Sequence, residues 1–114
     1  ELPTTSNGGT MVAPVEKKRP HHDLRSIKKE LSSVPALRIT KTATQCAERL
    51  GLTLQDVVGI IQGTTGTQFY KSMTSAGDSA IWQDVYHVHH KGLVLYVKFT
   101  VDIDGFLVVS FKEK

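Results

Sequence analysis

The C-terminal part of the chain alternates between apolar and polar residues, and this alternation constrains the fold more than any other feature. Within residues 92–101 every odd position is apolar, namely Leu93, Leu95, Val97, Phe99 and Val101. Residues 106–112 repeat the pattern, with apolar side chains at Leu107, Val109 and Phe111. Side chains of a strand point alternately to the two faces of a sheet, so such a segment buries one face only. We therefore predict two strands that share an apolar face.

The residues between these two segments, Asp102 to Gly105, determine how the strands pair. Ile103, Asp104 and Gly105 fit a three-residue hairpin loop that closes with glycine in the left-handed region. The pairs that follow from this loop length are Thr100–Val108, Lys98–Ser110 and Tyr96–Lys112. A shorter or longer loop would place polar side chains opposite apolar ones. The sequence therefore predicts a polar patch on the open face of the sheet, made of Tyr96, Lys98, Ser110 and Lys112.

Residues 69–74 and 80–87 combine aromatic side chains with alternating polar ones and are also predicted to be strands. A short glycine-containing turn separates them. Because short connections join all four predicted strands, we expect an antiparallel meander. Alternation then places Trp82 and Tyr86 in the core and Gln83 on the open face.

Helical patterns precede the strands. The predicted helices cover residues 23–32, 42–50 and 53–63. Asp23 can cap the first helix. Thr42 and Thr53 are followed three residues later by Gln45 and Asp56, which is the spacing of a capping box. Helices followed by a run of strands are typical of the α+β class, which is the fold class that we predict.

The length of 114 residues supports one hydrophobic core, and we predict a single domain over residues 16–114. Residues 1–15 are polar and rich in Thr, Gly and Pro, without a periodic pattern, so we expect them to be disordered. Met11 allows another interpretation, in which it is the natural start and the residues before it are a remnant of cloning.

Composition excludes several classes of protein. Cys46 is the single cysteine, so we expect neither an internal disulfide nor a multi-cysteine metal site, and we expect a buried, inert thiol. No apolar run approaches the roughly 20 residues that span a bilayer, and residues 1–15 lack the apolar segment of a signal peptide. We therefore expect a cytoplasmic protein without membrane contact. The net charge of +3 is compatible with a polyanionic partner without requiring one.

Four ordered segments resemble the MqsR (motility quorum-sensing regulator) family, the toxins of bacterial type II toxin–antitoxin pairs. The segments are FYKSMT at residues 69–74, IWQDVY at 81–86, LYVKFTV at 95–101 and VVSFKEK at 108–114. The similarity extends over residues 16–114. It implies a RelE-like toxin fold, with N-terminal helices packed on one face of a twisted, mainly antiparallel sheet. It also implies a sequence-selective endoribonuclease that cleaves mRNA and is held inactive by a cognate DNA-binding antitoxin protein.

The resemblance implies a set of site residues as well. The positions that match those associated with RNA cleavage are Lys71, Gln83, Tyr96 and Lys112. Tyr70 and Met73 match positions close to that site, and His87 matches a position where family members carry a cation. Lys98 joins this substrate-binding group through its predicted place in the polar patch. Simple alternation turns Tyr70 away from Lys71, so only edge twist or a bulge could bring its hydroxyl close.

These residue types suit RNA cleavage by the RNA's own 2′-hydroxyl. That reaction needs proton transfer and stabilisation of a pentavalent phosphorane, but no covalent residue on the protein. Lys71 can stabilise the phosphorane, Lys112 or Tyr96 can transfer a proton, and Gln83 can hold a phosphate or a base edge. We expect no metal and no other cofactor. A non-catalytic RNA-binding module that uses the same basic face is the alternative, and lysines that only keep the sheet soluble are a further one.

Other polar residues suggest chemistry less strongly. His87, His89 and His90 could be read as metal ligands or a catalytic histidine, but they lack a companion Cys or carboxylate at ligand spacing, and we expect an exposed loop there. Asp78 and Asp84 could form a pair of acid–base carboxylates. We expect Asp78 to be a turn residue and Asp84 to anchor a neighbouring side chain or the backbone.

Overall fold

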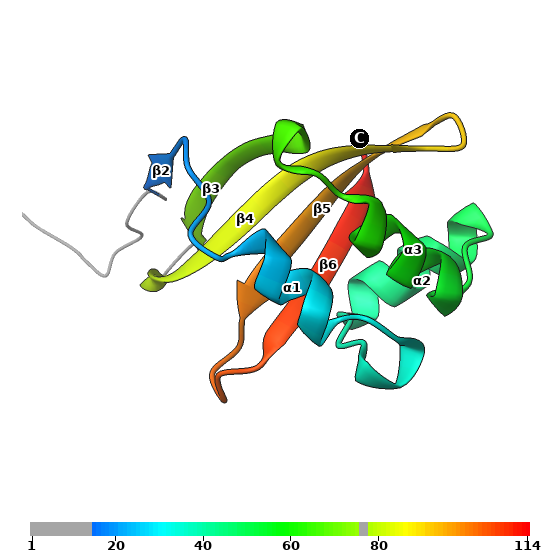
Figure 1. Ribbon diagram of the computed structural model, residues 1–114, viewed down its shortest axis with the longest axis horizontal. Coiled ribbons are helices and arrows are strands. Elements are labelled where there is room, and N and C mark those ends of the chain that lie inside the picture. The colour runs from blue at the N-terminus through cyan, green and yellow to red at the C-terminus, as the bar shows by residue number, and fades with distance from the viewer. Residues whose placement is uncertain (1–14, 76–77) are drawn as a thin grey trace, which may run out of the picture.

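The computed structural model of the chain describes residues 15–75 and 78–114. Its helices are α1 (Leu24–Glu30), α2 (Lys41–Leu50) and α3 (Leu54–Gly63), with 3-10 turns η2 (Val34–Ala36) and η3 (Gly66–Gln68). Its strands are β2 (Glu16–Lys17), β3 (Phe69–Ser75), β4 (Asp78–His90), β5 (Leu93–Val101) and β6 (Leu107–Glu113). The strands form one sheet in the order β2-β3-β4-β5-β6, with every neighbouring pair antiparallel. This confirms the α+β class and the meander of the last four strands (Figure 1).

The β5–β6 hairpin has the predicted register. Its cross-strand pairs include Tyr96–Lys112, Lys98–Ser110 and Thr100–Val108. Gly105 has a φ of 85°, and the N–H of Asp102 donates to the carbonyl of Phe106 at 2.8 Å. The Asp102 carboxylate accepts from the N–H groups of Asp104 and Phe106, at 2.9 Å each. The turn residues therefore fix which side chains of the two strands share a face.

Side-chain caps begin all three helices, although one cap differs from the prediction. Asp23 accepts from the N–H of Ser26 at 3.0 Å, and Thr53 and Asp56 form the expected reciprocal capping box. The prediction of Thr42 as a cap was wrong, because the cap is Thr40, two residues earlier, and α2 begins at Lys41. Thr40 is held in extended geometry by its own N–H, which donates to the carbonyl of Val109 at 3.1 Å. A contact with a distant strand thus decides where this helix begins.

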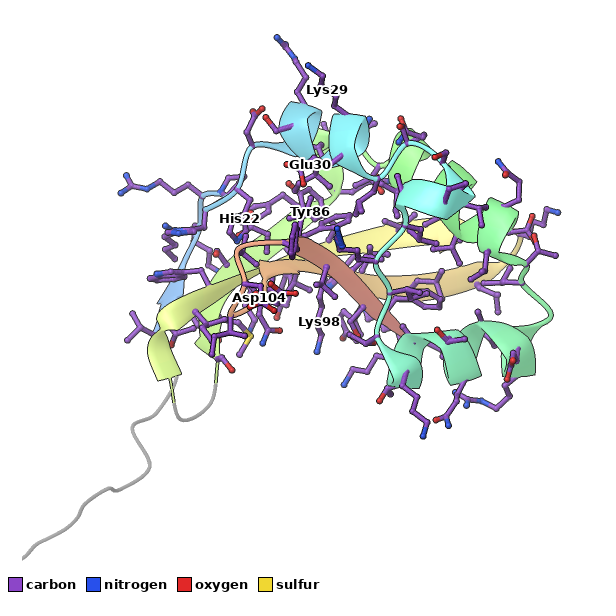
Figure 2. All side chains as sticks on the ribbon, turned by 90° about the horizontal axis from the view of Figure 1, so that it is seen from below. His22, Lys29, Glu30, Tyr86, Lys98 and Asp104 are labelled. Carbon is purple, nitrogen blue, oxygen red and sulfur yellow. The ribbon has the colours of Figure 1, made fainter. Side chains whose placement is uncertain are left out.

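One core joins the helices to the sheet. Its largest helical contributions come from Ile27, Leu31, Cys46, Val57 and Ile61. Its strand contributions include Tyr86, Leu95, Val97, Phe99, Val109 and Phe111. Cys46 is a buried free cysteine, as expected. Figure 2 shows Tyr86 on the side of the sheet that faces α1 and Lys98 on the opposite side, which leaves that second face open. None of the described helices is long and apolar enough to cross a membrane.

The prediction of Trp82 as a core residue was wrong. Trp82 is on the helix side of β4, but it is only half-buried and lies where the N-terminal residues cover the sheet instead of a helix. The ring of His21 stacks on it with centroids 5.3 Å apart, and the Nζ of Lys17 lies 4.3 Å from its ring centroid. Alternation gave the correct face, but it does not tell which segment covers that face.

The prediction of a loop at His87–His90 was also wrong. β4 continues to His90 and pairs with β5 to its end, with His87 opposite Tyr96 and His90 opposite Leu93. The turn that follows consists of Lys91 and Gly92, whose φ values are 48° and 82°. Two consecutive positive φ values are typical of the tight hairpin turn, which leaves no room for a longer loop.

Backbone bonds cover part of both margins of the four-stranded β3–β6 meander. β2 pairs with the free side of β3 through Glu16–Met73 and Lys17–Ser72. At the other end of the sheet, Ile39 forms a parallel bridge with Val109 of β6. Disorder was predicted for residues 1–15 and a turn for residues 75–78; residues 1–14 and 76–77 of these segments lie outside the described residues.

Candidate active site

Two cross-strand rows of side chains cross the open face of the sheet. The first row runs through Lys71, Val85, Lys98 and Ser110, on β3, β4, β5 and β6. The second row runs through His87, Tyr96 and Lys112, on β4, β5 and β6. Each position follows from alternation within its strand, so the hairpin register described above holds both rows together.

A shallow pocket of about 340 Å³ lies over these rows. Its lining residues are Tyr70, Lys71, Met73, Val85, Tyr96, Lys98 and Lys112. Val85 is only 3% exposed, although it belongs to the open face, because the surrounding side chains cover it. The pocket therefore has an apolar floor and a cationic rim. Most of the predicted site residues line it, and Gln83 and His87 lie beside it.

Gln83 lies two residues before Val85 on β4, opposite Met73 in the β3–β4 register. It shares the open face with Val85, and it is half-buried. The carboxamide is thus next to the pocket wall that Met73 forms, without lining the pocket itself. From this position the Gln83 carboxamide can contact the part of a bound ligand that extends out of the pocket along β4.

Tyr70 reaches the pocket because β3 is irregular at this point. The pairing register shifts between Phe69 and Lys71, so simple alternation does not hold for Tyr70. The Tyr70 ring stacks on His87, with centroids 4.2 Å apart and an interplanar angle of 29°. His87 in turn contacts Tyr96 edge-on, with centroids 4.8 Å apart. The three rings form a continuous aromatic wall along one side of the pocket.

His87 serves as the middle ring of this wall. Its Nε2 is buried and finds no hydrogen-bond partner among the described residues. Burial lowers the pKa of His87 below 6.5, and the charges of Lys114 and His89 add to this effect. A neutral imidazole between two phenol rings is suited to stacking. Within residues 15–75 and 78–114, no group of three or more His, Cys, Asp or Glu side chains could hold a metal ion.

Glu16 is a site residue that the sequence reasoning missed. Its carboxylate pairs with the Lys71 amine, with Oε2 and Nζ 2.5 Å apart. This contact raises the pKa of Lys71 and lowers that of Glu16. Glu16 lies 55 positions before Lys71, in a strand of two residues that is too short to show a periodic pattern. No local signal in the sequence indicates the pair.

The environment of Lys98 is opposite in its electrostatic effect to that of Lys71. Burial lowers the pKa of its amine, and the positive charge of Lys112 lowers it further. The two lysines that flank Val85 in the first row therefore differ. The charge of Lys71 is stabilised by a carboxylate, whereas that of Lys98 is destabilised by its surroundings.

Comparison with known proteins connects this geometry to a family. The family model described as "Motility quorum-sensing regulator, toxin of MqsA" matches residues 19–113. The chain belongs to the MqsR toxin family. It is similar to the curated "mRNA interferase toxin MqsR" of Escherichia coli (strain K12), with 42% identity over 100 residues. The aligned part covers 88% of this chain and 100% of that relative, so both the helices and the sheet of this MqsR-family chain are included.

Asp84 supports the site from the core side of the sheet in this MqsR-family protein. Its carboxylate is fully buried and accepts hydrogen bonds from the Ser72 hydroxyl at 2.7 Å and from the N–H groups of His21 and His22 at 2.9 and 2.7 Å. The expected anchoring role of Asp84 is thereby confirmed. Through these bonds Asp84 ties the N-terminal arm, which we define as residues 15–22, to β3 and β4. The same arm carries Glu16 to Lys71.

Proposed function

We propose that this MqsR-family chain is an endoribonuclease toxin that cleaves mRNA selectively at particular sequences, by metal-independent attack of the RNA 2′-hydroxyl. The observation that carries the proposal is the pocket over Val85, where Lys71, Lys98 and Lys112 surround a space next to the Tyr96 ring. A scissile phosphate placed in this pocket would meet cations on several sides. Preorganised positive charge of this kind stabilises the additional negative charge of a phosphorane.

In this mechanism each predicted residue has its own task. Lys71 stabilises the phosphorane, and its raised pKa keeps it charged throughout. Tyr96 and Lys112 lie directly opposite each other, and we assign to one of them the transfer of the 2′-hydroxyl proton. Gln83 holds a phosphate oxygen or a base edge beside the pocket.

The remaining predicted residues bind the strand around the reacting phosphate. Tyr70 and His87 offer ring faces to bases, as aromatic side chains do in other complexes with single-stranded RNA. Met73 adds an apolar contact, and Lys98 adds positive charge. The 2′-oxygen replaces the 5′-oxygen on phosphorus, so the products are a 2′,3′-cyclic phosphate and a free 5′-hydroxyl.

We also propose a protein partner and a place of action. The matching family is described as a toxin of MqsA, and we infer that a cognate DNA-binding antitoxin protein holds this chain inactive in the cytoplasm. Residues 16–114 act as one domain in this proposal, and the fold is related to that of RelE-like toxins. Co-purification with the neighbouring gene product tests the partner directly.

Cleavage of a long RNA by the purified protein tests the proposed function. We expect discrete fragments that end in a 2′,3′-cyclic phosphate or its opened 3′-phosphate, and we expect the same rate in excess EDTA. Loss of cleavage on chelation, with recovery on adding a divalent ion, would contradict the metal-independent mechanism. A salt-sensitive gel shift without any cleavage would support the non-catalytic RNA-binding module instead.

A further inference from the structure

Lys98 occupies the middle of the pocket. Its cross-strand neighbours in the first row are Val85 on β4 and Ser110 on β6, neither of which is ionisable. Val85 forms the apolar floor, and the Lys98 side chain is half-buried beside it. Figure 2 shows the Lys98 side chain on the face of the sheet opposite to α1. A phosphate over the floor of the pocket would therefore lie next to this amine.

The groups around Lys98 leave its protons free for exchange. Lys71, across β4, is already paired with Glu16, and this is the one ion pair among the described residues. Lys112, diagonal to Lys98 on β6, is exposed at the end of the strand, with its Nζ 5.7 Å from the Tyr96 ring centroid. On β4 the next ionisable neighbour is His87, in the second row. No described carboxylate thus competes for the Lys98 amine.

We propose that Lys98 is the general acid of the cleavage reaction and donates the proton that the departing 5′-oxygen needs. The inference rests on the proposed function and adds to it, because the predicted polar patch placed Lys98 only among the substrate-binding residues. In this step the 2′-oxygen forms a bond to phosphorus as the bond from phosphorus to the 5′-oxygen breaks. The 2′-hydroxyl proton leaves by way of Tyr96 or Lys112 to solvent, one Nζ proton of Lys98 moves to the 5′-oxygen, and the neutral amine regains a proton from water.

The ionisation of the two lysines that flank Val85 supports this division of tasks. Surroundings that push two pKa values apart commonly separate an acid–base group from a group that only stabilises charge. The Glu16 carboxylate raises the pKa of Lys71, so Lys71 keeps its proton. Burial and the charge of Lys112 lower the pKa of Lys98, which makes its ammonium a stronger acid.

A substrate with a better leaving group tests the proposal. After the cleaved sequence has been mapped, an RNA oligonucleotide is made with sulfur in place of the bridging 5′-oxygen at that position. A thiol ionises near pH 8.5, so a departing thiolate needs no proton, whereas a departing alkoxide does. Lys98→Met removes the amine but keeps the length and apolar stem of the side chain. Lys29→Met removes the same charge from α1, on the other side of the sheet (Figure 2).

We expect Lys98→Met to cleave the ordinary oligonucleotide about 10²- to 10⁴-fold more slowly than the unchanged protein in single-turnover experiments. On the sulfur-containing oligonucleotide its rate should match that of the unchanged protein. A variant that has lost only phosphate binding or pocket shape would remain slow on both substrates. Circular dichroism and the affinity for an uncleavable 2′-O-methyl RNA verify that the variant is folded and binds. Lys29→Met should be normal on both substrates.

Two outcomes would overturn the proposal while leaving the proposed function intact. In one, Lys98→Met either stays slow on the sulfur-containing oligonucleotide or cleaves the ordinary oligonucleotide as fast as the unchanged protein does. In the other, Lys112→Ala is the variant whose rate the sulfur restores, which would make Lys112 the acid. Lys98→Arg gives a second measure, because arginine keeps the charge but does not release a proton in this pH range. It should be slow on the ordinary oligonucleotide only. If the unchanged protein cleaves no RNA at all, the proposed function itself is wrong.

Discussion

At the scale of single residues, the ion pair between Glu16 and Lys71 bears on how the proposed site would bind RNA. In the proposed mechanism Lys71 faces a phosphate, yet in the free protein its amine is bound to a carboxylate from β2. The carboxylate keeps the lysine charged, but it also occupies the position that a phosphate oxygen would take. RNA and Glu16 therefore compete for one amine.

Replacing this carboxylate should strengthen RNA binding. We expect Glu16→Gln to bind an uncleavable 2′-O-methyl RNA more tightly at low salt, because Lys71 becomes available to a phosphate. One additional phosphate contact should steepen the plot of log K against log salt concentration by about 0.7 for single-stranded RNA. The measurement is a salt series of binding constants.

Glu48→Gln provides the matched control for this comparison. Glu48 is exposed on α2, so its substitution makes the same change in net charge outside the pocket. It should leave the slope of the plot unchanged. Equal slopes for Glu16→Gln and the unchanged protein would show that Glu16 does not compete with phosphate.

At the scale of elements, the N-terminal arm connects the site to the core side of the sheet. It is held by the buried Asp84 carboxylate and by the stacking of His21 on Trp82. Burial lowers the pKa of His21 below 6.5, and the charges of Lys17 and His22 lower it further, while Asp84 acts in the opposite direction. The docked arm therefore favours neutral His21.

We expect the arm to detach as the pH falls. Because the pKa of His21 is lower in the docked arm than in a free one, the undocked state binds more protons between the two values. Docking is therefore most stable above about pH 6.5 and weakens as the pH falls through the lowered pKa of His21. Fluorescence of Trp82, the single tryptophan, and hydrogen exchange of the His21 and His22 amides should both report the change.

His21→Phe is the control for the pH series. It keeps a ring on Trp82 but cannot take up a proton, so its fluorescence should vary less between about pH 7.5 and about pH 5. His87 also has a lowered pKa, but it lies on the open face, away from Trp82. An unchanged pH dependence in His21→Phe would assign the effect to another group.

At the scale of the whole molecule, one core should make the helices and the sheet unfold together. Leu95 is fully buried on β5 among the side chains of this core. We expect Leu95→Ala to lower the free energy of unfolding by about 2–5 kcal/mol through lost burial and the cavity left behind. Far-UV circular dichroism and Trp82 fluorescence should give the same urea midpoint. Two separate midpoints would show that residues 16–114 are not one folding unit.

Local patterns in the sequence were sufficient for much of this molecule. Alternation and the Asp102–Gly105 turn predicted the β5–β6 register, which brings Tyr96 and Lys112 together. The caps at Asp23 and Thr53 followed from side-chain chemistry within one helical turn. Such features depend on residues that are neighbours along the chain, so a single sequence contains the information for them.

Features that depend on distant segments were not predicted. Glu16 reaches Lys71 across 55 positions, and Thr40 begins α2 because its N–H bonds to the carbonyl of Val109. The arm covers Trp82, which alternation had placed in the core. The sequence also gave no indication that Lys71 and Lys98 have pKa values shifted in opposite directions, because those shifts arise from the packed surroundings of each amine.

The backbone bonds at the two margins of the sheet bear on how this protein behaves at high concentration. An outer strand with unpaired N–H and C=O groups is a template on which another chain can add, which leads to filaments and precipitation. Here the Glu16–Lys17 pair takes part of the β3 margin, and Ile39 takes part of the β6 margin. These contacts leave less unpaired strand edge exposed, which favours colloidal stability. That stability matters when a toxin accumulates faster than the protein that neutralises it.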